Sequence, residues 1–119
     1  MMYNKDNVFA KMISGEIEVN KLYEDKTLIA INDINPAAPI HILVIPKGEY
    51  VDLADFADKA PSEEVKHYFT MIDSIAKASG AEEYRIVSNK GPASGQSVFH
   101  FHTHILGNLT NTNLINKNL

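Results

Sequence analysis

The sequence predicts an α+β protein in which one long helix covers one face of an antiparallel sheet of about five strands. Three observations predict this class. Strand-like segments stand before and after a single long helical pattern, instead of alternating with helices. The first two of these segments flank a turn, as in a hairpin. The chain has 119 residues, which suits one domain spanning residues 1–119, and 45% of them are hydrophobic, enough for a modest core.

The first half of the chain supplies a short helix and three strands. In NVFAKMISGEI, Val8 and Met12 have helical spacing and Gly15 provides a stop. The segments NKLYED and TLIAIND form the hairpin. Two prolines in DINPAAP then break the chain, and IHILVIP, which is apolar on both faces, is typical of a central strand. The next segment, KGEYVDLADFA, is predicted to be irregular with one helical turn.

The long helix follows Pro61. Glu63 and Glu64 suit the positive end of its dipole, Lys77 suits the negative end, and Gly80 ends it. YRIVSN, KGPASGQS and SVFHFHTHIL read as a strand, a glycine-bearing loop and a long strand. The asparagine-rich residues 107–119 are predicted to be an irregular tail. The helix repeats apolar or small residues at i, i+3, i+4 and i+7: Val65, Tyr68, Phe69, Ile72, Ile75, Ala76 and Ser79.

Composition excludes several classes of protein. The chain has no cysteine, which excludes disulfides and thiolate metal sites. It has 15 acidic and 11 basic residues without a basic cluster, so nucleic acid is not an expected partner. The N-terminal segment lacks the apolar region of a secretory signal, and no apolar run approaches the roughly 20 residues that span a bilayer. We therefore expect a cytoplasmic protein with no membrane partner.

The segment VFHFHTHILG carries three histidines at every second position: His100, His102 and His104. Alternate side chains of a strand share one face, so we expect the three imidazoles to lie together. A chance arrangement is one interpretation, because single histidines in strands are usually structural. The arrangement is harder to dismiss because the opposite face is mostly apolar: Phe99, Phe101, Thr103 and Ile105.

A metal site is the second interpretation. Histidine is a common zinc ligand, and a His-x-His pair can share one ion. On a straight strand, however, the Cα atoms of His100 and His104 are about 13 Å apart, too far for both rings to reach one tetrahedral ion. A site of two histidines with another ligand, such as His41, stays open.

The third interpretation places a phosphate beside the histidines. Gly91 and Gly95 let backbone N–H groups approach phosphate oxygens closely. The segment Gly95–Ser97 leads directly into the histidine strand, where a bound phosphate would meet His102. A neutral imidazole can attack phosphorus and form a phosphohistidine. Its other ring nitrogen must then donate to a fixed acceptor, for which a backbone carbonyl of the same strand is plausible.

These residues resemble the histidine triad (HIT) family, specifically its Hint branch of nucleoside phosphoramidate hydrolases. The family motif, His-φ-His-φ-His-φ-φ with φ apolar, runs here from His100 to Leu106, and only Thr103 departs from it. The segments VFAKMISGEI, LYED, INDINPAAPIHILVIPK and GQSVFHFHTHILG also look like Hint-branch segments in the same order. The resemblance covers about residues 7 to 107 and implies a HIT-like fold over the whole chain, with a divergent end at 107–119.

The resemblance also implies roles. His102 matches the nucleophile, His100 and His104 match the histidines that orient it and contact phosphate, and His41 matches a buried fourth histidine. Asp33 matches the carboxylate that accepts from the ribose hydroxyls, although it would also suit a cap of the DINP turn. His41 as an ordinary core histidine and Asn89 as a turn residue stay open. The other matches are Ser97, Gln96, Gly95 and Asn89 around the phosphate and leaving group, and Ile34, Ile31, Phe9 and Met12 in the base pocket.

The implied activity is hydrolysis of purine nucleoside 5′-phosphoramidates with release of AMP or GMP. The family implies a homodimer, no catalytic metal and no cofactor, although adventitious zinc binding is possible. A dinucleoside polyphosphate hydrolase of the same family and a nucleotide-binding scaffold with weak activity are the alternatives. Hint-branch proteins usually follow the triad with Gly-Gly, whereas Gly107 here precedes Asn108, so the leaving group is left open.

Overall fold

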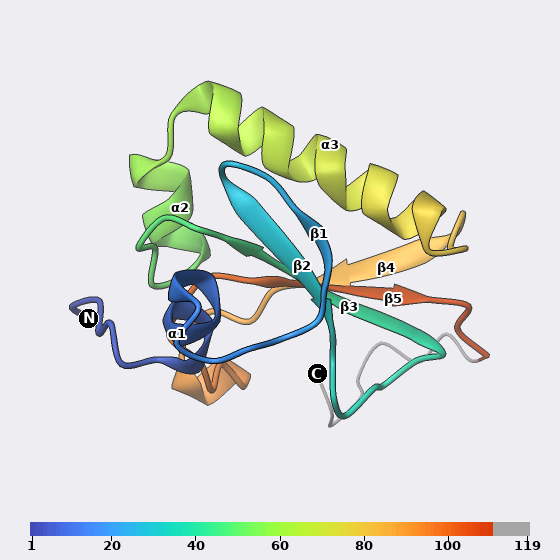
Figure 1. The fold of residues 1–119 in the computed structure, drawn as a ribbon, viewed down its shortest axis with the longest axis horizontal. Helices are drawn as coiled ribbons and strands as arrows, with labels where there is room; N and C mark the ends of the chain where they lie inside the picture. Colours follow the sequence, from blue (N-terminus) through green and yellow to red (C-terminus); the bar gives the residue numbers. More distant parts are fainter. Residues whose placement is uncertain (111–119) are drawn as a thin grey trace.

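The computed structural model describes residues 1–110 and has an antiparallel five-stranded sheet with three α-helices, which confirms the α+β prediction (Figure 1). No helix within these residues is long and apolar enough to cross a membrane. A short 3-10 helix lies between the last two strands. In chain order the elements are α1 (Val8–Ser14), β1 (Lys21–Glu24), β2 (Leu28–Asn32), β3 (Ile40–Pro46), α2 (Leu53–Lys59), α3 (Ser62–Ala78), β4 (Tyr84–Val87), the 3-10 helix (Pro92–Ser94) and β5 (Thr103–Gly107).

The strand order places the end of the histidine segment inside the sheet. The order is β1-β2-β3-β5-β4, so β3 is central, as predicted, and β5 lies between β3 and β4. In this register His104 lies between Leu43 of β3 and Val87 of β4. A backbone paired on both sides is held firmly, and His104 therefore has a fixed position.

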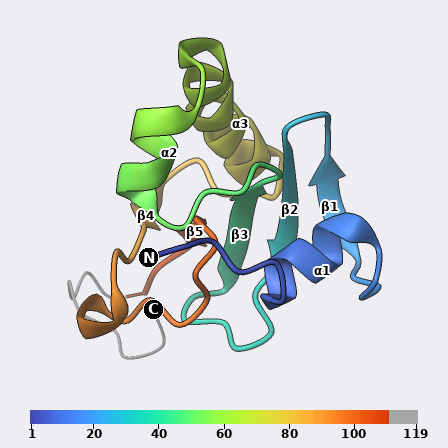
Figure 2. The ribbon, with the colours of Figure 1, turned by 90° about the vertical axis from the view of Figure 1, so that its left-hand side faces the viewer.

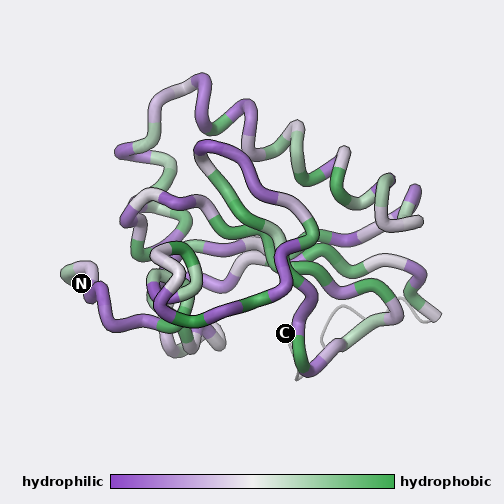
Figure 3. Tube along the Cα trace, in the orientation of Figure 1, coloured by the Kyte–Doolittle hydropathy of each residue, from purple (hydrophilic) through white to green (hydrophobic). Residues whose placement is uncertain are grey.

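The two faces of the sheet carry two separate hydrophobic clusters. In β3, Ile42 and Val44 belong to the cluster under α2 and α3, whereas Leu43 and Ile45 belong to the cluster under α1. Figures 1 and 2 show α3 running along one face, with α1 set apart from it. The sequence predicts one covered face; α1, through Phe9, also covers part of the second. In Figure 3 β2 and β3 are mostly hydrophobic, whereas α3 alternates, as an amphipathic helix does.

The segment predicted to be irregular contains α2, a helix of 7 residues. Its start is stabilised by two reciprocal contacts. The Asp52 carboxylate accepts from the Asp55 amide (2.9 Å), and the Asp55 carboxylate accepts from the Val51 amide (2.8 Å). This arrangement resembles a capping box, except that the second carboxylate is an aspartate and accepts from the amide of the residue before the N-cap. The sequence analysis missed the Asp-x-x-Asp spacing that predicts it.

The last strand is shorter than predicted. β5 begins at Thr103, so His100 and His102 lie before its regular pairing. Individual hydrogen bonds, instead of strand pairing, hold the segment that contains His100 and His102. The Phe101 amide donates to the Tyr50 carbonyl (2.7 Å), and the Ser88 hydroxyl donates to the His102 carbonyl (3.0 Å). Side-chain and loop partners of this kind have no short-range sequence pattern, which is why the prediction extended the strand too far.

The end of β5 explains the Gly-Asn pair. A Cβ atom on Gly107 would lie 2.5 Å from the Cβ of Ala81, so only glycine fits. Asn108 has a φ of 58°, in the left-handed region where asparagine is the best tolerated side chain after glycine. Asn108 therefore substitutes for a second glycine at modest conformational cost. Gly107 belongs to β5 and not to the predicted irregular tail; residues 111–119 of that tail lie outside the described residues.

Candidate active site

A cavity of about 700 Å³ opens beside the histidine segment, which is large enough for a nucleotide-sized ligand. Its walls come from α1, from the ends of β2 and β4, from β3, and from the loop that leads into β5. These segments are far apart in the chain, and the strand order brings them together. The lining residues are Phe9, Asp33, Ile34, Asn35, Pro36, Leu43, Asn89, Gly95, Ser97, Val98, His102 and His104.

His102 lies in the cavity wall with its ring orientation fixed. Its Nδ1 lies 2.7 Å from the His100 carbonyl oxygen. A carbonyl only accepts, so Nδ1 carries the proton and donates, and Nε2 keeps its lone pair. The Phe9 and His102 rings pack edge-on, with their centroids 4.9 Å apart. Burial lowers the pKa of His102, while the carbonyl acceptor opposes that shift. The result is a neutral imidazole with a free basic nitrogen.

His100 does not line the cavity and is fully buried. Its Nε2 lies 2.6 Å from the Pro46 carbonyl oxygen, and its Nδ1 lies 2.6 Å from the Tyr3 hydroxyl. Burial is the main cause that lowers the pKa of His100. Both ring nitrogens are therefore occupied by protein groups, and the side chain supports the segment instead of contacting a ligand.

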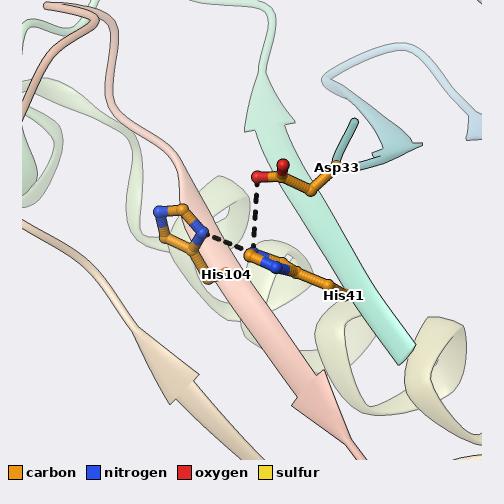
Figure 4. A group of neighbouring side chains, drawn as sticks. All are labelled: Asp33, His41 and His104. Atoms are coloured by element: carbon orange, nitrogen blue, oxygen red, sulfur yellow. Dashed lines mark hydrogen bonds and ion pairs between the residues drawn. The ribbon is translucent and has the colours of Figure 1, made fainter. Parts of the chain in front are cut away.

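The side chains of His104, His41 and Asp33 form a second group, in which the two histidines are buried and Asp33 is partly exposed (Figure 4). The Ala37 amide donates to Nδ1 of His41 (2.9 Å), which leaves the His41 proton on Nε2. That Nε2–H donates to Nδ1 of His104 (2.8 Å) and lies 3.4 Å from an Asp33 oxygen. His104 must then carry its own proton on Nε2. Burial, followed by the neighbouring His102 and His41, lowers the pKa of His104 to about 4.

Asp33 caps a turn, as one interpretation of the sequence predicts, and its contact with ribose hydroxyls stays a prediction. One of its carboxylate oxygens accepts from the Asn35 amide (2.7 Å) and so caps the turn after β2. The other lies near His41, and the residue lines the cavity. His41 itself is buried behind His104 and does not line the cavity. Both of its ring nitrogens are hydrogen-bonded, as in a core histidine whose polar atoms have partners, and its part in catalysis stays a prediction.

The same three side chains are the one group of possible metal ligands within the described residues. Their ligand atoms lie within 4.8 Å of one another. A metal needs an unprotonated nitrogen, yet the Ala37 N–H already occupies Nδ1 of His41 and places the proton on Nε2, the nitrogen that faces the group. A metal on Nε2 would force a proton onto Nδ1, opposite the Ala37 N–H. The hydrogen bonds therefore fit a proton-bearing pair better than a metal site.

The glycine-bearing loop provides fewer free amides than its sequence predicts. The Gly95 amide donates to the Pro92 carbonyl and the Gln96 amide to the Gly91 carbonyl, both at 3.1 Å. The Gln96 side chain bonds to Val51, Val98 and Gly91 and is buried, so it fixes the loop and does not line the cavity. Among the described residues, no partner competes for the amide or hydroxyl of Ser97.

The structure brings most of the predicted site residues to one cavity. Phe9, Asp33, Ile34, Asn89, Gly95, Ser97, His102 and His104 line it, whereas Met12, Ile31, Gln96, His41 and His100 lie outside its walls. Ile31 is buried beneath α1 and Met12 packs on the same cluster. The sequence analysis missed four wall residues, namely Asn35, Pro36, Leu43 and Val98. It also missed Tyr3 and Ser88, which contact the triad from behind. The alternation of side chains in IHILVIP is the one sequence pattern that indicates Leu43. In the sheet, Leu43 pairs with His104.

Comparison with known proteins gives one consistent family. A model of the HIT domain matches residues 14–111. An uncharacterized HIT-like protein of Rickettsia prowazekii is 50% identical over 119 residues, which cover 98% of this chain and 99% of the relative. A 14 kDa zinc-binding protein of Zea mays is 42% identical over 103 residues, or 84% of this chain and 80% of the relative.

Solved structures agree with these relatives. A HIT family hydrolase from Clostridium thermocellum superposes with a TM-score of 0.85 at 34% identity, covering 94% of this chain and 99% of that one. A histidine triad protein from Clostridium difficile gives a TM-score of 0.81 at 40% identity, covering 96% of this chain and all of the other (100%). The similarity therefore extends over the sheet, the helices and the histidine segment.

Proposed function

Because the chain belongs to the HIT domain family, we propose that it is a purine nucleoside 5′-phosphoramidate hydrolase with a covalent nucleotidyl-histidine intermediate. One observation carries this proposal. The His100 carbonyl fixes the His102 proton on Nδ1, and this leaves the Nε2 lone pair of a cavity-lining residue free to attack. A nucleophile of this kind needs no separate base to remove its proton.

The reaction proceeds in two balanced steps. In the first, Nε2 of His102 bonds to the α-phosphorus as the P–N bond breaks, and the leaving nitrogen takes the bonding electrons and a proton from solvent. In the second, the oxygen of a water molecule bonds to the phosphorus and the water gives up a proton to solvent. The electrons of the N–P bond return to Nε2 of His102, and AMP or GMP is released. The Ser97 amide and hydroxyl and the Nε2–H of His104 are the donors suited to the phosphoryl oxygens.

The charge of the cavity favours an amine over a phosphate leaving group. Asp33 is the one charged side chain among the lining residues, and no lysine or arginine accompanies it. A dinucleoside polyphosphate would bring several negative charges toward this carboxylate without a cation to offset them. A phosphoramidate brings one charged phosphoryl group, and its amine leaves as a neutral or positive group. We therefore favour P–N hydrolysis over the polyphosphate alternative.

The test is a short incubation with adenosine 5′-phosphoramidate followed by mass spectrometry of the protein. We expect an adduct of the mass of AMP that maps to His102, and turnover of this compound at least about tenfold faster than of a diadenosine polyphosphate. A preference for the polyphosphate would support the alternative hydrolase. Nucleotide binding with no adduct and no turnover would indicate a binding or scaffold protein.

We propose that the reaction requires no metal. The maize relative is named a zinc-binding protein, and among the described residues here Asp33, His41 and His104 are the group that could hold an ion. The protonated Nε2 of His41 argues against this use. Prolonged dialysis against a chelator should leave turnover unchanged, and loss of turnover that zinc restores would contradict the proposal.

We further propose a homodimer through β4 and the flank of α3. β4 stands at an edge of the sheet, and Ile86 on it is 44% exposed. Asp73 of α3 accepts from the Tyr84 hydroxyl of β4 (2.7 Å), so this flank of α3 faces that edge. Phe69 lies one turn before Asp73 and is 42% exposed. A second copy would cover both apolar side chains and the sheet edge.

The dimer proposal predicts the effect of Ile86→Lys. A charge buried between two copies disfavours association, so we expect the variant to elute as a monomer at protein concentrations where the parent is a dimer. Leu53→Lys serves as the control, because Leu53 is equally exposed (43%) but lies at the start of α2. Light scattering coupled to gel filtration measures the mass. An unchanged dimer in Ile86→Lys would exclude this interface.

Two further expectations remain predictions. The residues 1–119 are expected to form one HIT domain, of which the family model matches 14–111. The cytoplasmic location is also a prediction from the sequence, and cell fractionation tests it.

A further inference from the structure

Tyr3 lies before the residues that the HIT domain model matches, yet its side chain reaches the triad. Its hydroxyl is 2.6 Å from Nδ1 of His100, and the two rings meet edge-on with centroids 5.5 Å apart. The N-terminal segment is held close by Asn7, the N-cap of α1, whose side chain also donates to the Asn4 carbonyl (2.8 Å). The rings of Tyr3 and Phe9, at the two ends of this segment, therefore pack against the first two triad histidines.

The hydrogen bonds determine which nitrogen of His100 carries the proton. The Pro46 carbonyl can only accept, so Nε2 of His100 is protonated and donates to it (2.6 Å). In a neutral ring Nδ1 is then an acceptor, and the Tyr3 hydroxyl is its donor. His100 is completely buried, and the Tyr3 hydroxyl is the partner of its Nδ1. Without the hydroxyl, a buried acceptor would lose its partner.

The position of His100 matters because its backbone orients the proposed nucleophile. The His100 carbonyl accepts the Nδ1–H of His102 at 2.7 Å, and this bond directs Nε2 of His102 toward the cavity. His100 lies before the start of β5, so no sheet ladder fixes its carbonyl. The side-chain hydrogen bonds of His100 to Pro46 and Tyr3 fix its position instead.

We propose that Tyr3 is a positioning residue for the triad, which holds His100 in its Nε2–H form and thereby keeps the His102 ring aimed at the substrate phosphorus. This inference rests on the proposed function for its consequence in catalysis. The hydrogen bond itself is independent of that function. Tyr3 does not line the cavity, so it should affect the chemical step and not nucleotide binding.

The test compares Tyr3→Phe with Tyr84→Phe. Both changes remove one phenol hydroxyl from a short hydrogen bond, at 2.6 Å to His100 and at 2.7 Å to Asp73. Tyr84 lies on β4, away from the triad, and is the matched control. Two readouts are measured on each protein: the ¹⁵N chemical shifts of the histidine ring nitrogens, and the rate of nucleotidyl-His102 formation together with the affinity for AMP.

We expect Tyr3→Phe to move the Nδ1 resonance of His100 toward that of an unbonded imidazole nitrogen. The rate of adduct formation should fall about threefold to thirtyfold with AMP affinity unchanged, as expected for loss of orientation. Tyr84→Phe should leave both the His100 resonance and the rate of adduct formation unchanged. An unchanged His100 resonance, or a changed resonance with an unchanged rate, would overturn the proposal; so would an equal fall of the rate in both variants, which would indicate general destabilisation.

The proposal for Tyr3 and the hydrolase proposal can fail independently of each other. If the parent protein forms no nucleotidyl adduct, the hydrolase proposal fails. The ¹⁵N spectrum still shows whether Tyr3 holds His100, and the Nδ1–H signal of His102 then reports whether its orientation depends on Tyr3. An unaltered His102 signal in Tyr3→Phe would overturn the positioning role in that case.

Discussion

Replacing His102 with alanine is expected to lower turnover of an adenosine phosphoramidate by a factor of about 10³ or more, because the covalent route loses its nucleophile. The nucleotidyl adduct should disappear with it. AMP should still bind, since Asp33, Ile34 and Phe9 line the cavity independently of the imidazole. Quenched-flow kinetics and calorimetry measure the two effects separately.

The matched control is His67→Ala. His67 lies on α3 with 43% of its side chain exposed and bonds to Asp25, far from the cavity lining. Its replacement should leave adduct formation unchanged. Turnover that survives in His102→Ala, with AMP still bound, would refute the assignment of the nucleophile. Loss of both turnover and AMP binding would show instead that the replacement disturbs the whole site.

Much of the fold follows from local patterns in the sequence. The alternation of Ile42 and Val44 with Leu43 and Ile45 places β3 between two apolar layers, and the period of α3 identifies its buried side. α2 was predicted only as one helical turn, because its stability comes from the caps at its start and from burial of Phe56, rather than from a long periodic face.

Thr103 shows where a family pattern and a particular chain differ. It occupies a motif position that is normally apolar, on the face that packs against α3. Tyr68 of α3 donates its hydroxyl to the Val44 carbonyl (2.7 Å), and its oxygen lies 2.8 Å from Oγ1 of Thr103. All three groups are buried. The Thr103 hydroxyl therefore has a hydrogen-bond partner in Tyr68, 35 residues away. No local sequence pattern predicts this contact.

The site could be predicted from sequence only where its residues are adjacent in the chain. The spacing of His102 and His104, with the loop before them, was sufficient to place both in one cavity with Ser97. The occupied amides of Gly95 and Gln96 could not be anticipated, because they depend on the 3-10 helix that closes the loop. Tyr3 is 97 residues from His100, and only the folded chain brings them together.

The buried histidines predict that the protein loses stability between pH 7 and 5. His104 has a pKa of about 4 in the folded protein against an ordinary value of 6.5. Over this interval the unfolded chain binds the proton and the folded protein does not, so acidification favours unfolding. From pH 7 to 5 the loss from His104 alone is about 2 kcal/mol. His41, His100 and His102, with pKa values also lowered by burial, change stability in the same direction.

Urea unfolding at pH 7, 6 and 5 measures this loss, and His104→Asn tests its source. Asparagine does not titrate, so the variant, although less stable at pH 7, should lose about 2 kcal/mol less on acidification than the parent. The lowered pKa values of carboxylates such as Asp55 and Asp73 affect stability mainly below pH 4. Equal stability at pH 7 and 5 would therefore mean that these imidazoles are not held neutral, and the mechanism that needs a neutral His102 would lose its support.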